Sequence, residues 1–260
     1  MQKMSPDERS IRVFFGQSGS GKTHFFNVFR QDPGYQHPHG WAKSVDDIRV
    51  QYFGKRIGLN AGVGHADERQ MRALYDQCTA KENNYAYTFL FQDAERALIV
   101  DGVKTVLIEA NLRSFVRDYD LLVALVGNVR GAIQRIDNEP ALKQGMLPPD
   151  PPSELHLQTV LLFCDLATIL ERRRRRPYQN YEENLHAFAR QVVTFQFPNF
   201  PFLAVDTSDE SPEAEVKRLA EITDFFAGRE CGSLMATRAE EARNSLAAMQ
   251  MEVRKRGLAK

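Results

Sequence analysis

The chain has 260 residues, of which 43% are apolar, enough for one large or two small domains with a substantial core. Lysine and arginine total 34 and so do aspartate and glutamate, so the balanced charge excludes nonspecific nucleic-acid binding through a global electrostatic field. No run of about 18 apolar residues occurs and the N-terminus is polar, so we expect no membrane span, no signal peptide and a cytoplasmic protein.

Residues 11–30 form the most informative stretch of the sequence. An apolar, β-branched run over residues 11–15 predicts a buried strand, and the pattern of Phe25, Phe26, Val28 and Phe29 predicts an amphipathic helix. Between them stands GQSGSGKT, which fits the phosphate-loop pattern G-x-x-x-x-G-K-[ST]. A strand before this loop and a helix after it are the context that the motif requires.

Each fixed position of the loop has a physical role in binding a nucleotide. Glycines allow backbone conformations in which successive N–H groups converge on phosphate oxygens at a helix N-terminus. The lysine reaches the β- and γ-phosphates, and the threonine hydroxyl binds Mg²⁺. The predicted nucleotide-binding residues are therefore Gly16, Ser18, Gly19, Ser20, Gly21, Lys22 and Thr23, with Thr23 as the magnesium ligand.

A second strand is predicted over residues 41–45, with two carboxylates directly after it. Asp46 and Asp47 begin a helix that continues through Arg49 to about residue 53. Ligands of α/β proteins bind at the carboxyl edge of the sheet, so these acids belong on the same edge as the phosphate loop. Either can accept a proton from an alcohol, while Asp47 can instead cap the helix. The sequence prefers Asp46 only slightly.

Helical spacing marks residues 66–81 and 88–100, and an apolar strand follows over residues 105–110. Glu109 stands near the end of this strand. A buried carboxylate there predicts either a role linked to Mg²⁺ or to substrate orientation, or a purely structural pair with an arginine. Residues 119–126 fit a helix or a strand, and the proline-rich residues 138–153 predict an excursion over the surface.

A strand is predicted over residues 157–164, and the helix after it carries five consecutive arginines before Pro177. Such a run is commonly a solvated face or a phosphate-binding patch. In a P-loop phosphotransferase it predicts a lid, over about residues 166–190, in which one or two guanidinium groups neutralise the transferring phosphoryl group.

A short strand over residues 202–205 is followed by Asp206 at the ligand edge and by a helix over residues 212–226. From residue 238 onward the chain is charged and helix-prone. The predicted fold class is α/β, a P-loop kinase fold with a mostly parallel sheet flanked by helices and an arginine-rich lid. The predicted division is a kinase domain over residues 1–227 and a C-terminal helical extension over residues 228–260.

Four stretches in this order carry a resemblance: GQSGSGKT, SVDDIR, LIEANLR and ILERRRRRP. Together they resemble P-loop kinases of the polynucleotide kinase and zeta-toxin group, including phage kinases that phosphorylate 5-hydroxymethyluracil in DNA. The resemblance spans residues 11–190 and implies ATP and Mg²⁺ as cofactors. The phosphatase domain of some polynucleotide kinases has no counterpart here.

The resemblance also implies roles for single residues. Asp46 matches the general base, and Arg49 matches an arginine that contacts a phosphate of the acceptor. An acid on the third strand orients that arginine in the family, and here it is Glu109 where the pattern has aspartate. Arg172 and Arg176 match lid positions, with Arg176 as the first choice for contact with the γ-phosphate.

The sequence thus predicts an ATP-dependent kinase that phosphorylates an alcohol on a nucleic acid. The first choice of acceptor is the hydroxymethyl group of 5-hydroxymethyluracil in DNA, and the second is a 5′-hydroxyl end. One alternative is a small-molecule kinase acting on a nucleoside, nucleotide or nucleotide sugar. Another is a nucleotide-hydrolysing switch, against which stands the lack of an apolar strand followed by Asp-Glu. DNA is the expected partner, a membrane is not, and the sequence leaves protein partners open.

Overall fold

The computed structural model describes residues 9–17, 19–58, 68–110, 120–133, 155–175, 181–195, 197, 201–229 and 232–258. Its centre is a five-stranded sheet in the order β2-β3-β1-β4-β5, in which every neighbouring pair is parallel. The strands are β1 (Arg9–Gly16), β2 (Gly40–Ser44), β3 (Thr105–Glu109), β4 (Leu155–Phe163) and β5 (Leu203–Asp206). The five predicted strands are confirmed to within two residues at each end.

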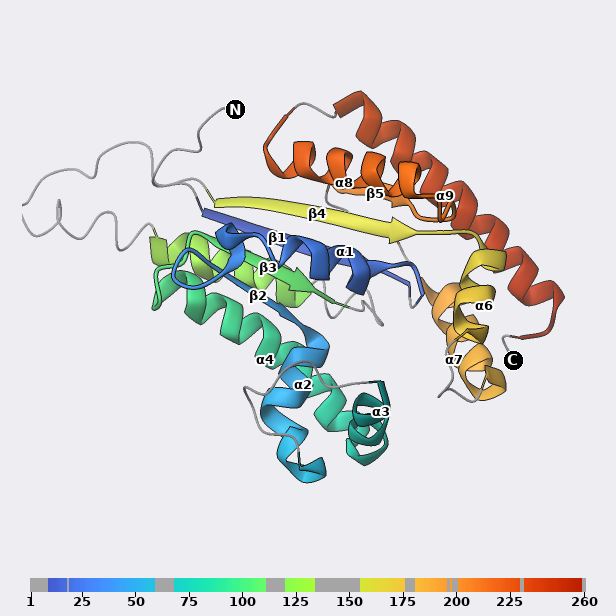
Figure 1. Ribbon diagram of the computed structural model, residues 1–260, viewed down its shortest axis with the longest axis horizontal. Helices are drawn as coiled ribbons and strands as arrows, with labels where there is room; N and C mark the ends of the chain where they lie inside the picture. The colour runs from blue at the N-terminus through green and yellow to red at the C-terminus, as the bar shows by residue number, and fades with distance from the viewer. Residues whose placement is uncertain are drawn as a thin grey trace, which may run out of the picture.

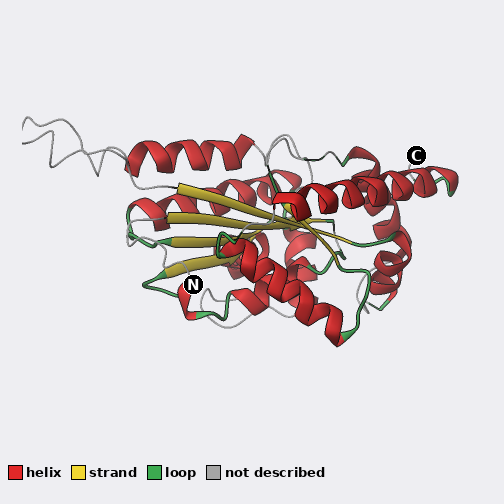
Figure 2. Cartoon of the chain, turned by 90° about the horizontal axis from the view of Figure 1, so that it is seen from above, coloured by secondary structure: helices red, strands yellow, loops and turns green. Residues whose placement is uncertain are grey.

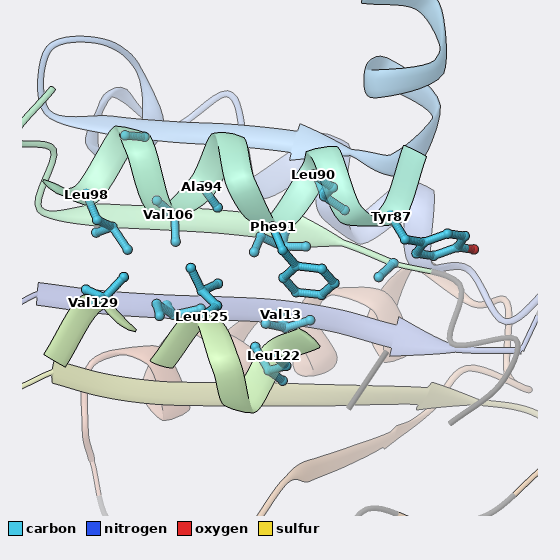
Figure 3. Packing of buried hydrophobic residues seen from close by; sticks show 14 of the residues in the cluster. Val13, Tyr87, Leu90, Phe91, Ala94, Leu98, Val106, Leu122, Leu125 and Val129 are labelled. Carbon is cyan, nitrogen blue, oxygen red and sulfur yellow. The ribbon is translucent and has the colours of Figure 1, made fainter. Parts of the chain in front are cut away.

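Helices cover both faces of the sheet (Figure 2). Side chains alternate along β1, so Ile11 and Val13 face one layer while Phe14 faces the other. The first layer contains α4 (Ala80–Ile99) and the helical residues 120–133, whose apolar side chains meet those of β1 and β3 (Figure 3). Both faces are buried, which explains why the strands are almost wholly apolar.

The opposite face carries α1 (Lys22–Phe29) and α8 (Pro212–Phe226). Phe14 contacts Phe29 and Phe226, at centroid separations of 5.6 and 5.7 Å. The helix α8 has the bounds that the sequence predicts, because Ser211 caps its N-terminus and Pro212 takes the first helical position. The phosphate loop therefore lies between a fixed strand and a fixed helix.

Two helices differ from the sequence expectation. The segment predicted as 66–81 divides into α3 (Glu68–Gln77) and the start of α4, because Thr79 accepts from the backbone of Glu82 in a capping box and begins a new helix. The helix predicted over 88–100 is only the second half of α4. Residues 120–133 settle the open choice at 119–126 as helix, whereas residues 138–153 lie outside the described part of the chain.

The helices α2 (Val45–Phe53) and α6 (Leu166–Arg174) begin at the carboxyl edge, and α7 (Tyr181–Thr194) lies beside α6 (Figure 1). The helix α9 (Gly232–Lys255) runs along the sheet toward this edge, and short 3-10 turns occur at Pro33–Tyr35 and Gly54–Ile57. The helix α9 buries Leu246, Met249 and Val253 against α7, and Ala242 against β4 and β5. Among the described residues, no helix has both the length and the apolar character needed to cross a membrane.

Candidate active site

The phosphate loop joins β1 to α1 and has the backbone geometry that its glycines permit. Gly16, Gly19 and Gly21 have φ values of 144°, 94° and 83°, which residues with a side chain rarely adopt. A Cβ atom on Gly16 would lie 2.1 Å from the carbonyl oxygen of Leu162 on β4. The first glycine is therefore required both by conformation and by space. Ser18, also predicted here, lies outside the described residues.

Lys22 is the first residue of α1 and is only 4% exposed. Its Nζ donates a hydrogen bond of 2.8 Å to the carbonyl oxygen of Gln17, so the side chain folds back over the loop. This places the ammonium group beside the backbone that is predicted to receive phosphates. The position is the one that the motif assigns to this lysine.

Thr23 and Glu109 meet across the top of the sheet. The Thr23 hydroxyl donates to Glu109 Oε1 at 2.9 Å. Parallel pairing sets Glu109 beside Phe14 on β1 and Ser44 on β2, so the carboxylate stands between the phosphate loop and the start of α2. Burial raises the pKa of Glu109, the charge of Lys22 and the Thr23 hydrogen bond lower it, and Asp46 and Asp47 raise it further. Lys22, Asp46 and Asp47 are therefore close enough to Glu109 to act on its charge at the carboxyl edge.

The oxygen atoms at this point fit Mg²⁺, which prefers hard oxygen ligands and keeps several waters. Thr23 supplies a hydroxyl, and the buried carboxylate of Glu109 stands 2.9 Å from it. No group of three or more His, Cys, Asp or Glu side chains suited to a metal occurs in the described part of the chain. The fit is thus to a cation shared with phosphate oxygens, as in other phosphoryl-transfer sites, and not to a closed protein cage.

Asp46 and Asp47 are neighbours in sequence but differ in their surroundings. Asp47 Oδ2 accepts from the Ser44 backbone at 2.7 Å and from the Ser44 hydroxyl at 2.9 Å, in a capping box at the start of α2. The Arg30 guanidinium lies 3.3 Å from the same oxygen. The side chain of Asp46 is 43% exposed, and its Oδ1 pairs with Arg49 at 2.5 Å. The geometry gives Asp47 a capping role and leaves Asp46 accessible at the edge.

Arg49 is buried although it is charged. Its side chain is 1% exposed, lies with its guanidinium carbon 5.7 Å from the centre of the Tyr87 ring, and pairs with Asp46 one helical turn earlier. The resemblance implied that Glu109 orients this arginine. In the structure the Thr23 hydroxyl donates to Glu109, a contact that agrees with the metal-linked alternative for this carboxylate, and the orientation of Arg49 by Glu109 stays a prediction. The predicted contact of Arg49 with an acceptor phosphate stays a prediction.

The arginine run of α6 divides among several environments. Arg173 is 6% exposed, with its guanidinium carbon 5.1 Å from the centre of the Phe188 ring. Arg175 is largely exposed and pairs with Glu171 and Glu210, each at 3.2 Å. Arg176, the first choice for contact with the γ-phosphate, lies outside the described residues. One face of the helix thus packs inward while another stays in water.

Arg172 contacts groups from three different segments of the chain. Its guanidinium donates to Gly19 O at 3.0 Å, to Thr207 Oγ1 at 3.1 Å, to Thr207 O at 2.5 Å and to Glu210 Oε1 at 2.8 Å, with Cys164 Sγ 3.6 Å away. The side chain therefore joins α6 to the phosphate loop and to the loop between β5 and α8. Its predicted contact with a phosphoryl group stays a prediction.

Sequence reasoning missed Thr207, Cys164 and Glu210 as members of this site. Only the position of Asp206 at the end of a predicted strand signalled that the loop after β5 reaches the ligand edge. No motif connects residues 164 or 207–210 to the phosphate loop, which is more than 140 positions away. Parallel pairing of β1 with β4, and of β4 with β5, brings these segments together.

Comparisons with known proteins yield structural likenesses alone. No protein-family model matches the chain, and no curated protein sequence matches it. An unliganded sugar kinase from Janibacter sp. HTCC2649 is 17% identical, with 84% of this chain and 95% of that one covered at a TM-score of 0.44. A gluconokinase from Sinorhizobium meliloti 1021 is 15% identical, with 92% and 97% covered at a TM-score of 0.45.

These identities and TM-scores are too low to assign a substrate. The fold class follows from the structure itself: a wholly parallel five-stranded sheet, a phosphate loop between β1 and α1, and an arginine-rich helix after β4. The chain has the α/β architecture of a P-loop kinase, as the sequence predicts.

Proposed function

We propose that the protein is an ATP-dependent phosphotransferase that transfers the γ-phosphoryl group to an alcohol. One observation carries this proposal: the phosphate-loop residues Lys22 and Thr23 and the accessible carboxylate of Asp46 gather around Glu109 at one edge of the sheet. A group that binds phosphates and a group that can accept a proton are the two requirements of phosphoryl transfer to a hydroxyl.

The binding step uses the loop. The backbone N–H groups near Gly21 and the ammonium of Lys22 bind the β- and γ-phosphates, and the start of α1 favours negative charge there. Thr23 and Glu109 would hold Mg²⁺, which offsets charge on the phosphate oxygens. The contribution of this half of the site is alignment and electrostatic stabilisation.

The transfer step uses Asp46. The acceptor oxygen forms a bond to the γ-phosphorus while the bond from phosphorus to the β–γ bridging oxygen breaks, and ADP leaves. The hydroxyl proton passes to Asp46, whose Oδ1 is held by Arg49 at 2.5 Å. Because Arg49 is buried and fixed to α2, it keeps the carboxylate in one orientation through the reaction. Arg176 is proposed to neutralise the transferring group, as the resemblance implies.

The proposal specifies the acceptor as a molecule with an alcohol group. The resemblance of the sequence favours DNA, whereas the two similar structures are described as a sugar kinase and a gluconokinase, nearer to the small-molecule alternative. Among the described residues, no contact singles out a nucleic acid. One assay therefore tests both classes of acceptor, nucleic acids and small molecules.

The test is incubation with γ-labelled ATP, Mg²⁺ and a panel of acceptors. The panel comprises DNA with 5-hydroxymethyluracil, unmodified DNA with a free 5′-hydroxyl, RNA, nucleosides, nucleotide sugars, sugars and sugar acids. We expect label on at least one acceptor and its loss in both Lys22→Ala and Asp46→Asn. Rapid ATP hydrolysis without acceptor that persists in Asp46→Asn would show a switch module and overturn the proposal.

A further inference from the structure

Two residues outside the phosphate-loop motif hold two successive carbonyl groups of that loop. The Thr207 hydroxyl lies 3.0 Å from Ser20 O and 3.1 Å from Phe163 O; because Phe163 O already accepts from the Thr207 N–H, we assign the hydroxyl proton to Ser20 O. The Arg172 guanidinium donates to Gly19 O at 3.0 Å. The two side chains also bond each other, because Arg172 donates to Thr207 Oγ1 at 3.1 Å and to Thr207 O at 2.5 Å. They form one unit on the side of the loop that faces β4, α6 and the β5–α8 loop.

This unit is itself anchored. Thr207 is 2% exposed, and its backbone N–H donates to Phe163 O at the end of β4 at 2.8 Å. Arg172 is fixed by Glu210 at 2.8 Å. Cys164 adds a thiol that donates to Gly19 O at 3.9 Å, and burial raises its pKa to about 11, which keeps the thiol protonated as a donor.

Peptide geometry converts this contact into an effect on the anion site. In a planar trans peptide the C=O of one residue and the N–H of the next point in opposite directions. A Ser20 carbonyl held by Thr207 therefore turns the Gly21 N–H away from Thr207. In the same way, the Gly19 carbonyl is held by Arg172, so the Ser20 N–H points in the opposite direction. It donates to Gln17 O at 3.1 Å and closes the turn of the loop.

We propose that Thr207 and Arg172 are positioning residues that set the phosphate-binding conformation of the loop, and that Arg172 acts through Gly19 and not by touching the transferred group. This inference rests on the part of the proposed function in which the loop binds phosphates. The glycines permit the conformation, and these two side chains select it. The inference does not depend on the identity of the acceptor.

The experiment measures binding without any acceptor. Affinities for Mg-ADP and for inorganic tripolyphosphate are compared by calorimetry for the wild type, Thr207→Val, Thr207→Ser and Arg172→Lys. Loss of one net hydrogen bond predicts that Thr207→Val weakens both ligands by the same factor, roughly fivefold to tenfold. Thr207→Ser keeps the hydroxyl and is expected to retain affinity. Thr223→Val, which removes a hydroxyl bonded only within α8, is the matched control and is expected to change neither affinity.

Each outcome decides the inference. Equal weakening of both ligands with rescue by serine supports it, because tripolyphosphate has no nucleoside for Thr207 to contact. Weakening of ADP alone shows a direct contact with the nucleoside and overturns it, as does unchanged binding of both. Should Thr207→Val fail to fold, Arg172→Lys carries the same expectation, since one ammonium cannot reach both Gly19 and Thr207. A wild type that binds neither ligand contradicts the proposed function itself.

Discussion

The two halves of the carboxyl edge are built in different ways. Around β1, β4 and β5, backbone groups of the phosphate loop are held by side chains from distant segments, such as Arg172 and Thr207. Around β2 and β3, Asp46, Asp47 and Arg49 come from a single helix start and are held mainly within it. The nucleotide half therefore depends on tertiary contacts, and the acceptor half depends on local capping. We therefore expect substitutions in the nucleotide half to disturb nucleotide binding, and substitutions in the acceptor half to disturb phosphoryl transfer.

The largest effect is expected from Lys22→Ala in the nucleotide half. Removing the ammonium that neutralises the phosphates should lower both ADP affinity and transfer, the latter by about 10³-fold. Calorimetry with Mg-ADP and a labelled-ATP assay measure the two effects. Equal ADP affinity in the variant and the wild type would argue against the phosphate site.

Asp46→Asn should separate the two halves. The amide cannot accept the proton of the acceptor, so transfer is expected to fall by about 10²-fold or more. ADP affinity should stay unchanged because Asp46 is predicted to contact neither nucleotide phosphate nor base. Normal transfer in this variant would remove Asp46 from the role of base.

Glu109 lies between the two halves, and the pH dependence of the thermal stability of Glu109→Gln tests its role. Burial raises the pKa of Glu109 above its ordinary value of 4.5, so the folded protein holds this proton more tightly than the unfolded chain. The resulting cost to stability is absent below pH 4.5 and grows as pH rises through the folded pKa. Glutamine has no charge to bury, so the variant should have a higher Tm than the wild type at pH 7.

Thermal unfolding in a pH series measures this effect. The Tm difference should shrink as pH falls toward 4.5, and each kcal/mol corresponds to about 2–4 °C. The exposed residue Glu240 supplies the control Glu240→Gln, for which no such trend is expected. A Tm difference that is the same at every pH would show that packing, not charge burial, is responsible.

The smallest effect is expected from Ser44→Ala in the acceptor half. It removes the hydroxyl that accepts from the Asp47 backbone N–H at 3.0 Å in the capping box of α2. The expected cost is about 1 kcal/mol of stability with transfer nearly unchanged. Chemical unfolding and the transfer assay check the two parts. A loss of transfer as large as that of Asp46→Asn would mean that the cap also aligns the base.

Local sequence determined much of this protein. The glycines of the phosphate loop, the apolar strands before Glu109 and Phe163, and the Ser211 cap were all predictable, because each depends on backbone sterics, burial or hydrogen bonds between near neighbours. Local sequence distinguished only weakly between Asp46 and Asp47 as the base. Both residues fit a helix start, and the capping box between Ser44 and Asp47 shows which carboxylate is occupied by the cap.

Tertiary structure alone decided which distant groups meet. The five consecutive arginines are the same residue type, so the sequence does not distinguish them. In the structure Arg172 reaches the phosphate loop, Arg173 packs on Phe188 and Arg175 is largely exposed to water. They differ because a helix turns successive side chains to different faces. Thr207 enters the site through the pairing of β5 with β4, and Glu109 meets Thr23 through the pairing of β3 with β1. Such contacts depend on strand order and register, which no short motif encodes.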